Sequence, residues 1–442
     1  MKQLSRKNLI LVGLTLFSMF FGAGNLIFPP FLGQMSGTNM WIAMFGFAVT
    51  AIGFPILGVV AVAKSGGLDA LAKRVHPIFS FIFTLLIYIS IGPGLAIPRT
   101  AGTSFEMAVL PFLSEGMPAD TMRLVYSCIF FFIAFLIALK PEKLTDRLGK
   151  ILTPCLLVLI TIIFILCLLH PMGNYGSPVN KYVSNPFTTG FLEGYQTMDT
   201  IAALNFGILI AINIKARGIK EENDVVRETI KAGFIAGIIL LCVYSALGHM
   251  GALTSGVNQT SANGAETLTL LVNFLLGKFG LVLLGIIFFI ACLNTCVGLL
   301  CCCSEYFYGL VPKIPYRMWL LLFTIISVMI ANLGLSAILQ ISSPVLQIIY
   351  PVAIVLITLA FIHPRIKKYK LVYPITIGTT GIVSIISVLN EKNVKIAGVS
   401  HILEQLPFYD AGLVWFVPAI ISLLISIILS FVWNKKGINN KL

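Results

Sequence analysis

Apolar runs of about 20 residues recur along the whole chain and alternate with short polar segments. Runs of this length cross a hydrocarbon core about 30 Å thick as α-helices that rise about 1.5 Å per residue. The pattern predicts twelve membrane-spanning helices, at about residues 8–32, 40–63, 78–98, 121–139, 151–169, 191–214, 230–250, 271–303, 317–336, 341–362, 371–389 and 411–433. Because no long polar interval divides them, we expect an all-α polytopic membrane protein with a single transmembrane domain over residues 1–442.

Composition and charge agree with a bilayer as the solvent. The chain is 58% hydrophobic and 11% charged, against roughly 45–50% and 25% in an average soluble domain. With the N-terminus inside, 24 of the 30 Lys and Arg residues fall on that side, which predicts cytoplasmic N- and C-termini in the cell membrane. The net charge of +13 then reflects short loops that face anionic lipid, and no basic cluster indicates nucleic-acid binding. Six basic residues are expected outside: Arg99, Arg123, Lys181, Lys278, Lys392 and Lys395.

The first apolar run contains a stretch that is poorly suited to a continuous helix, FFGAGNLIFPP at residues 20–30. Glycine and proline are the poorest helix formers, and an asparagine amide is costly in hydrocarbon unless a partner satisfies it. We therefore predict a broken helix around Gly22, Gly24 and Asn25, with Pro29 and Pro30 limiting its second half. The alternative is that the glycines serve close helix packing.

The sixth run, GFLEGYQTMDTIAALNFGILIAINIK, is also irregular. Asp199 lies about 12 Å into this span, where a carboxylate that faces lipid would cost on the order of 3 kcal/mol. The side chain is therefore expected to face protein, water or a ligand. Small residues, including Ala202, follow it.

These two irregular spans are the first members of two groups of five spans with opposite orientation. Such a pattern indicates an inverted-repeat transporter, in which a substrate binds near the midplane between two broken helices. We expect repeats at about residues 8–170 and 191–363, followed by two additional helices within about 371–433. Irregular backbone at that depth is tolerated where it lines a cavity.

The segments FFGAGNLIFPPFLG and GYQTMDTIAALNFG resemble signatures of the bacterial branched-chain amino acid:cation symporter family, the BrnQ-type carriers. The resemblance extends over the whole chain in span count and length. It implies symport of leucine, isoleucine and valine with Na⁺ or H⁺ by alternating access, without an ATPase subunit or another cofactor. The oligomeric state and the preference among these substrates stay open. A symporter of another small amino acid or solute on the same fold is the alternative.

A more distant resemblance is to the leucine-transporter fold. Its first span carries a G-x-G-N-x-x-x-P pattern, which corresponds to residues 22–29 here, and FFIACLNTCVG resembles a sodium-binding segment of its eighth span. The resemblance implies that backbone N–H groups at Ala23 and Gly24 hold the substrate carboxylate. Together with the irregular sixth span, it leads us to expect a substrate site at Gly22, Ala23, Gly24, Asn25, Asp199, Thr200 and Ala202. It also implies a cation site: Asn25 contacts a substrate-linked Na⁺, and Ser18, Phe21, Ala291, Asn294 and Thr295 hold a second Na⁺.

Two residues depart from that pattern. Asn294 stands where the pattern has a hydroxyl, and Asp199 has no clear equivalent. The Asp199 carboxylate has three open roles: it pairs with the substrate ammonium, carries a coupling proton, or caps a half-helix.

Other function classes fit the sequence less well. An ion channel is expected to repeat one pore motif around an axis, whereas the two irregular spans have opposite orientations. An enzyme within the membrane needs a nucleophile or metal set, but the spans offer only the isolated acids Asp199 and Glu305. All nine cysteines lie in apolar spans, so a disulfide framework is not expected.

Overall fold

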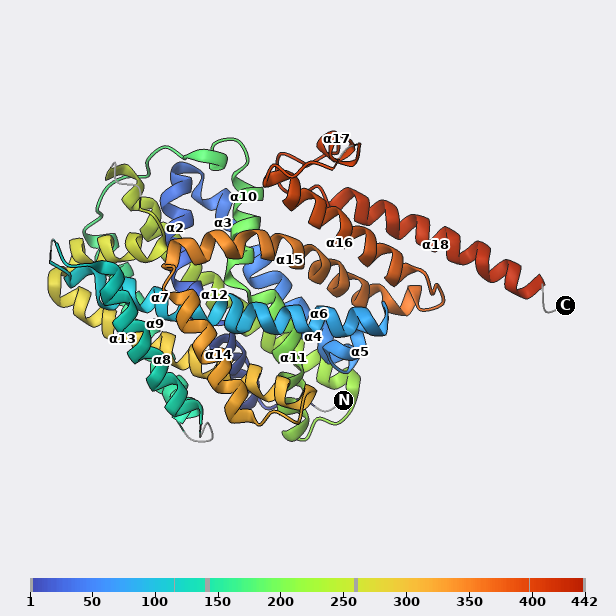
Figure 1. The fold of residues 1–442 in the computed structure, drawn as a ribbon, viewed down its shortest axis with the longest axis horizontal. Helices are drawn as coiled ribbons and strands as arrows, with labels where there is room; N and C mark the ends of the chain where they lie inside the picture. Colours follow the sequence, from blue (N-terminus) through green and yellow to red (C-terminus); the bar gives the residue numbers. More distant parts are fainter. Residues whose placement is uncertain (1–2, 115, 140–143, 258–260, 397, 440–442) are drawn as a thin grey trace.

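The computed structural model describes residues 3–114, 116–139, 144–257, 261–396 and 398–439, with side chains for all of these except residues 23, 144–153 and 433–439. Within these ranges the structure is built from helices and contains no strand, as expected (Figure 1). Eight helical stretches of the described residues are long and apolar enough to cross a membrane. The expected count of twelve spans therefore remains a prediction.

The helices follow the apolar runs in order. They are α1 (Arg6–Phe20), α2 (Ala23–Ser36), α3 (Met40–Ala48), α4 (Phe54–Ser65), α5 (Leu68–Ala72), α6 (Pro77–Ile89), α7 (Ala96–Ala108), α8 (Ala119–Ala138), α9 (Leu144–Leu169), α10 (Pro186–Glu193), α11 (Asp199–Ala216), α12 (Glu222–Thr254), α13 (Gly264–Leu310), α14 (Tyr316–Ala331), α15 (Leu335–Ile366), α16 (Val372–Glu391), α17 (Val399–Glu404) and α18 (Phe416–Asn439). The π-helical segments η2 (Val49–Gly53) and η3 (Ser90–Gly94) and the 3₁₀ turn η6 (Gly194–Thr197) lie within three of the predicted spans.

The first span is broken where the sequence predicts it. Helix α1 ends at Phe20 and α2 begins at Ala23, and the backbone at Gly22 is extended, with φ −114° and ψ −173°. The Asn25 side-chain oxygen accepts a hydrogen bond of 3.2 Å from the Gly22 N–H. This bond satisfies one of the backbone donors that the start of a helix leaves free.

The expectation that Pro29 and Pro30 limit the second half-helix is wrong, because both lie inside α2. Direct contact with neighbouring helices explains how α2 continues past them. A Cβ atom added to Gly251 of α12 would stand 1.9 Å from the Pro30 carbonyl oxygen, and one on Gly264 of α13 would stand 1.7 Å from the Ile27 oxygen. Only glycine permits such close approach, and this packing holds α2 in shape where the prolines remove backbone hydrogen bonds.

The sixth span is also broken, but at a residue that carries no glycine signal. The turn η6 ends at Thr197, and Met198 adopts a left-handed conformation with φ 64° and ψ 8°. Helix α11 then begins at Asp199. The break therefore directs the first turn of α11 toward the break in the first span.

The third span differs from the prediction, which ended it at residue 98 and placed Arg99 outside the membrane. The chain kinks within η3, where Gly92 has φ −92° and ψ −133°, and α7 then continues to Ala108. Arg99 lies in the first turn of α7 and is only 6% exposed. The prediction that Arg99 lies outside the membrane is therefore wrong, and five of the six basic residues predicted outside keep that prediction.

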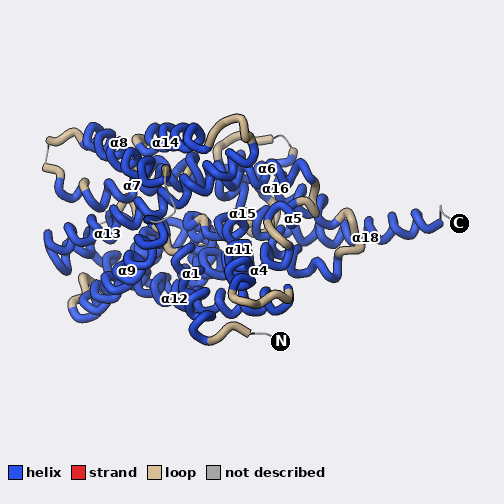
Figure 2. Tube along the Cα trace, turned by 90° about the horizontal axis from the view of Figure 1, so that it is seen from below, coloured by secondary structure: helices blue, strands red, loops and turns tan. Residues whose placement is uncertain are grey.

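The C-terminal helices α16 and α18 pack beside α15, and α18 extends away from the rest of the bundle in both views (Figures 1 and 2). They match the two additional helices expected after the repeats. The repeat boundaries themselves remain a prediction.

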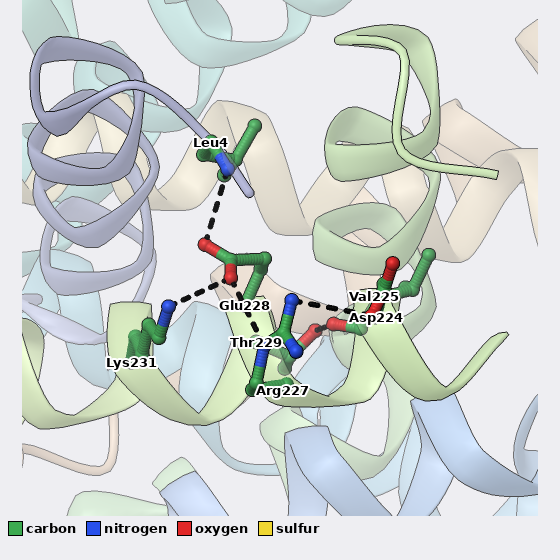
Figure 3. A network of polar contacts seen from close by, with 7 residues as sticks. All are labelled: Leu4, Asp224, Val225, Arg227, Glu228, Thr229 and Lys231. Atoms are coloured by element: carbon green, nitrogen blue, oxygen red, sulfur yellow. Dashed lines mark hydrogen bonds and ion pairs between the residues drawn. The ribbon is translucent and has the colours of Figure 1, made fainter. Parts of the chain in front are cut away.

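The N-terminal segment is held against the start of α12 by a polar network (Figure 3). The Glu228 side chain is fully buried and accepts hydrogen bonds from the Leu4 backbone N–H at 3.4 Å and from Lys231 Nζ at 2.9 Å. Arg227 Nε donates to the same carboxylate at 3.4 Å. Arg217, just after α11, donates to Asn8 of α1 at 3.0 Å. These contacts tie one end of α1 to α11 and α12.

Candidate functional site

The two helix breaks meet at a cavity of about 300 Å³. Its walls include residues of α1, α2, α7, α9, α11 and α13, which span much of the sequence. The lining includes these residues that the sequence predicts for the substrate or the cation: Ser18, Phe21, Gly22, Gly24, Asn25, Asp199, Ala202, Ala291, Asn294 and Thr295. The fold therefore gathers both predicted sets around one cavity.

Two residues of the predicted substrate site, Thr200 and Ala23, are not among the described residues that line the cavity. The Thr200 hydroxyl donates a hydrogen bond of 3.1 Å to the Thr50 carbonyl of η2, and the side chain does not line the cavity. Thr200 therefore links α11 to the second span. Ala23 begins α2, but its side chain lies outside the described part of the structure.

Asn25 joins the two breaks directly. Its side-chain nitrogen donates hydrogen bonds to Asp199 Oδ2 on α11 and to the Tyr244 hydroxyl on α12. Together with the Gly22 N–H bond, these contacts use both ends of the amide. Because Asn25, Asp199 and Tyr244 are all buried, a polar group without a partner here would be costly.

Asp199 occupies the first turn of α11. Helix N-termini carry partial positive charge and free N–H groups, which favour a carboxylate at this position. The Asp199 backbone N–H also lies 3.4 Å from the Thr197 hydroxyl. Among the described residues, the carboxylate accepts the Asn25 amide and makes no capping hydrogen bond to the backbone of α11. Its three predicted roles, in substrate binding, proton coupling or capping, stay predictions.

Arg99 brings a positive charge into the same cavity, which sequence reasoning missed. Its Nη1 donates a hydrogen bond of 2.7 Å to the Gln196 carbonyl of η6. The guanidinium lies 5.3 Å from the ring centroid of Phe28 on α2 and interacts electrostatically with Asp199. The Gly92, Pro93 and Gly94 sequence just before Arg99 was the available signal for a kink that carries the helix inward.

The part of the cavity predicted for the cation includes the side chains of Asn294 and Thr295. The Asn294 Oδ1 atom is buried and has no hydrogen-bond partner among the described residues. Thr295 Oγ1 would lie 3.7 Å from a Cβ atom added to Gly22, so α13 approaches the break in the first span. Carbonyl oxygens of unwound backbone together with side-chain oxygens are the donors that transporters use for Na⁺. The chemistry of this donor set therefore fits the predicted ion.

The central cavity continues along α11. A second cavity of about 930 Å³ shares Phe206, Leu209 and Cys302 with the first. It extends to Leu310 at the end of α13 and Tyr316 at the start of α14. Arg217, just past the same end of α11, contacts Asn8 near the start of α1. The second cavity therefore extends toward the side of the bundle where α1 begins.

Tight contacts close the opposite side of the cavity. The Gln34 side-chain oxygen on α2 accepts hydrogen bonds of 3.1 Å from the Ser261 N–H and from the Thr267 hydroxyl. Asn263 donates to Glu106 of α7 at 2.7 Å. A Cβ atom on Gly33 would stand 2.0 Å from the Gly248 carbonyl oxygen, so α2 and α12 touch along their backbones. Among the described residues, these contacts pack α2, α7, α12 and α13 closely on this side.

Comparison with known proteins identifies relatives over nearly the full length. A family model described as "Branched-chain amino acid transport protein" matches residues 5–432. The branched-chain amino acid permease BrnQ of Bacillus subtilis (strain 168) is 40% identical over 437 residues, which cover 98% of this chain and 99% of the relative. The permease BraB of the same organism is 38% identical over 436 residues, 98% of each chain. Both relatives are named as permeases, which are transporters and not enzymes.

Solved structures of transporters share the fold. The inward-facing conformation of Mhp1 aligns with a TM-score of 0.63 at 11% identity, over 99% of this chain and 95% of that chain. MhsT in complex with L-phenylalanine aligns with a TM-score of 0.58 at 16% identity, over 98% and 99%. The likeness confirms the expected leucine-transporter-type fold.

Proposed function

Because the chain belongs to the branched-chain amino acid transport protein family, we propose that it carries leucine, isoleucine and valine across the cell membrane together with a cation, by alternating access. The family match confirms the resemblance of FFGAGNLIFPPFLG and GYQTMDTIAALNFG to this family. Substrate identity rests on what the relatives are named to transport.

The observation that carries the proposal is the meeting of two broken helices at one cavity. Asn25 and Asp199 join the breaks across this cavity. A carrier needs a central site that faces one side of the membrane at a time, between half-helices whose free backbone groups serve as ligands. The closed side is held by packing and a few hydrogen bonds, which a rocking motion can separate.

Na⁺ is the coupling ion that we propose, with H⁺ as the alternative. Ser18, Phe21 and Ala291 offer backbone carbonyls, while Asn294 and Thr295 add side-chain oxygens in the same cavity. The unpartnered Asn294 Oδ1 favours a ligand at this position. Proton coupling would instead need a titratable group, and Asp199 is the acid that lines the cavity.

Leucine uptake into proteoliposomes under an imposed Na⁺ gradient, an H⁺ gradient or no gradient tests this proposal. We expect accumulation driven by Na⁺, and Thr295→Ala should raise the Na⁺ concentration for half-maximal uptake by about tenfold, since one oxygen ligand is lost. Thr15→Ala is the matched control, because Thr15 is an exposed threonine of α1 whose hydroxyl bonds its own helix.

Two outcomes would contradict the proposal at different levels. Binding of leucine without accumulation under any gradient would remove the symporter function. Normal Na⁺ dependence in Thr295→Ala, combined with loss of pH-driven accumulation in Asp199→Asn, would replace sodium with a proton as the coupling ion.

A further inference from the structure

We propose that Arg99 and Asp199 select for zwitterionic α-amino acids, with the Arg99 guanidinium binding the substrate carboxylate and Asp199 binding its ammonium group. The inference rests on the proposed function and names the chemistry by which the same cavity recognises its substrate. It makes Arg99, a residue of α7, a specificity-determining residue.

Arg99 has more hydrogen-bond donors than the protein uses. A guanidinium carries five N–H donors, and the structure gives Arg99 one hydrogen bond, from Nη1 to the Gln196 carbonyl. The side chain is 6% exposed and lines the cavity, so its remaining donors face the space in which a ligand would lie. A buried guanidinium with free donors is suited to bidentate binding of a carboxylate.

The surroundings hold the guanidinium at the break in the first span. It lies 5.3 Å from the ring centroid of Phe28, and a Cβ atom added to Gly24 would stand 2.9 Å from Nη2. The positive charge therefore adds to the free N–H groups at the start of α2, so both favour an anion at the same place.

The two charges line the same cavity without a direct ion pair between them among the described residues. One Asp199 oxygen accepts the Asn25 amide. A ligand with both a carboxylate and an ammonium on one carbon can satisfy both protein charges at once. A ligand with a single charge leaves the opposite protein charge buried without a ligand partner, which is strongly unfavourable.

Apolar side chains form much of the remaining wall. Ile91, Phe206 and Leu299 line the cavity and offer no polar group to a substrate side chain. The site thus combines one dipolar end with an aliphatic end. This arrangement fits an α-amino acid with an apolar side chain.

Competition against labelled leucine uptake in the unsubstituted protein is the first test. Leucinol lacks the carboxylate, and 4-methylpentanoate lacks the ammonium group. We expect both to compete about 10- to 100-fold more weakly than leucine, the factor that charged hydrogen bonds supply. Competition by either analogue within about threefold of leucine would overturn the inference.

Arg99→Gln provides the second test, since glutamine keeps a donor for the Gln196 carbonyl and removes the charge. We expect leucine to bind about 10- to 100-fold more weakly, while leucinol binding is unchanged. The ratio of leucine affinity to leucinol affinity should therefore fall by the same factor. A purely structural role would weaken both ligands equally and preserve that ratio. Arg123→Gln on α8, whose arginine pairs with Asp120 away from the cavity, should retain the original ratio.

The outcomes separate this inference from the proposed function. Failure of the unsubstituted protein to bind or carry leucine overturns both. Normal leucine uptake with an unchanged ratio in Arg99→Gln overturns the role of Arg99 alone. If Arg99→Gln does not fold, analogue competition in the unsubstituted protein still decides whether the site selects a zwitterion.

Discussion

At the scale of single residues, a few side chains connect the two helix breaks. The Asn25 amide binds the Gly22 backbone on one side and reaches Asp199 and Tyr244 on the other. It therefore caps a half-helix and holds two spans in register. These contacts also explain why an amide and a carboxylate are stable at this depth, since each has buried partners.

Gly24 gives a prediction at this scale. A leucine there should leave membrane insertion and expression largely intact, because leucine is a good spanning residue. Uptake should fall to background, because the new side chain would displace Arg99 and Phe28, which lie 2.9 Å and 3.2 Å from the position of its Cβ. Gly378→Leu on α16 is the control, since a Cβ atom there meets no neighbour within 4 Å. Both variants are measured by expression level and by initial leucine uptake. Near-normal uptake in Gly24→Leu would instead support the alternative that Gly24 serves only helix packing.

At the scale of elements, the start of α12 anchors the N-terminal segment through a buried acid. Glu228 is fully buried, while its partners Lys231 and Arg227 remain partly exposed. Loss of the carboxylate would leave the Leu4 N–H and two basic side chains without this acceptor. Figure 3 shows how these groups converge on Glu228.

We expect Glu228→Ala to destabilise the protein by about 1–3 kcal/mol, the contribution of a charged hydrogen-bonding group. The measurement is the midpoint of thermal unfolding in detergent, which should fall by a few degrees. Glu222→Ala in the first turn of α12 is the control, since Glu222 is exposed. Equal midpoints for the two variants would show that the anchoring network contributes nothing measurable to stability.

At the scale of the whole molecule, the orientation of the bundle decides which side the cavity faces. The basic residues predict that the N-terminal side is cytoplasmic. The two cavities along α11 extend toward that side, so under this topology we expect the site to open to the cytoplasm. Figure 1 shows the N-terminus near the bottom and α17 at the top, at opposite ends of the bundle.

Cysteine labelling tests this orientation. Ser177→Cys and Lys392→Cys should react with an impermeant thiol reagent in intact cells, because both positions are exposed on the side predicted to face outward. Lys313→Cys, exposed between α13 and α14, should react only after the membrane is opened. Labelling is compared with the unsubstituted protein, which has nine free cysteines. The reverse pattern would invert the topology.

The sequence by itself determined the membrane environment of this protein, its helical class, the place where the first span breaks and the irregularity of the sixth span. A bilayer core offers no hydrogen bonds to the backbone, so an apolar run must be a helix, and Gly, Asn and Asp within such a run must mark an exception. The residues Gly22, Asn25 and Asp199 carry this signal locally.

Tertiary structure alone decided which side chains meet at the breaks. Arg99 enters the cavity because α7 continues past a kink, Asn25 finds Tyr244 across 219 residues of sequence, and Thr200 turns toward Thr50. The break at Met198 and the continuation of α2 through Pro29 and Pro30 likewise depend on neighbouring helices. Local signals such as Gly92, Pro93 and Gly94 mark where a helix can bend. They do not encode which side chains then meet, because that follows from close packing between segments that are distant in the chain.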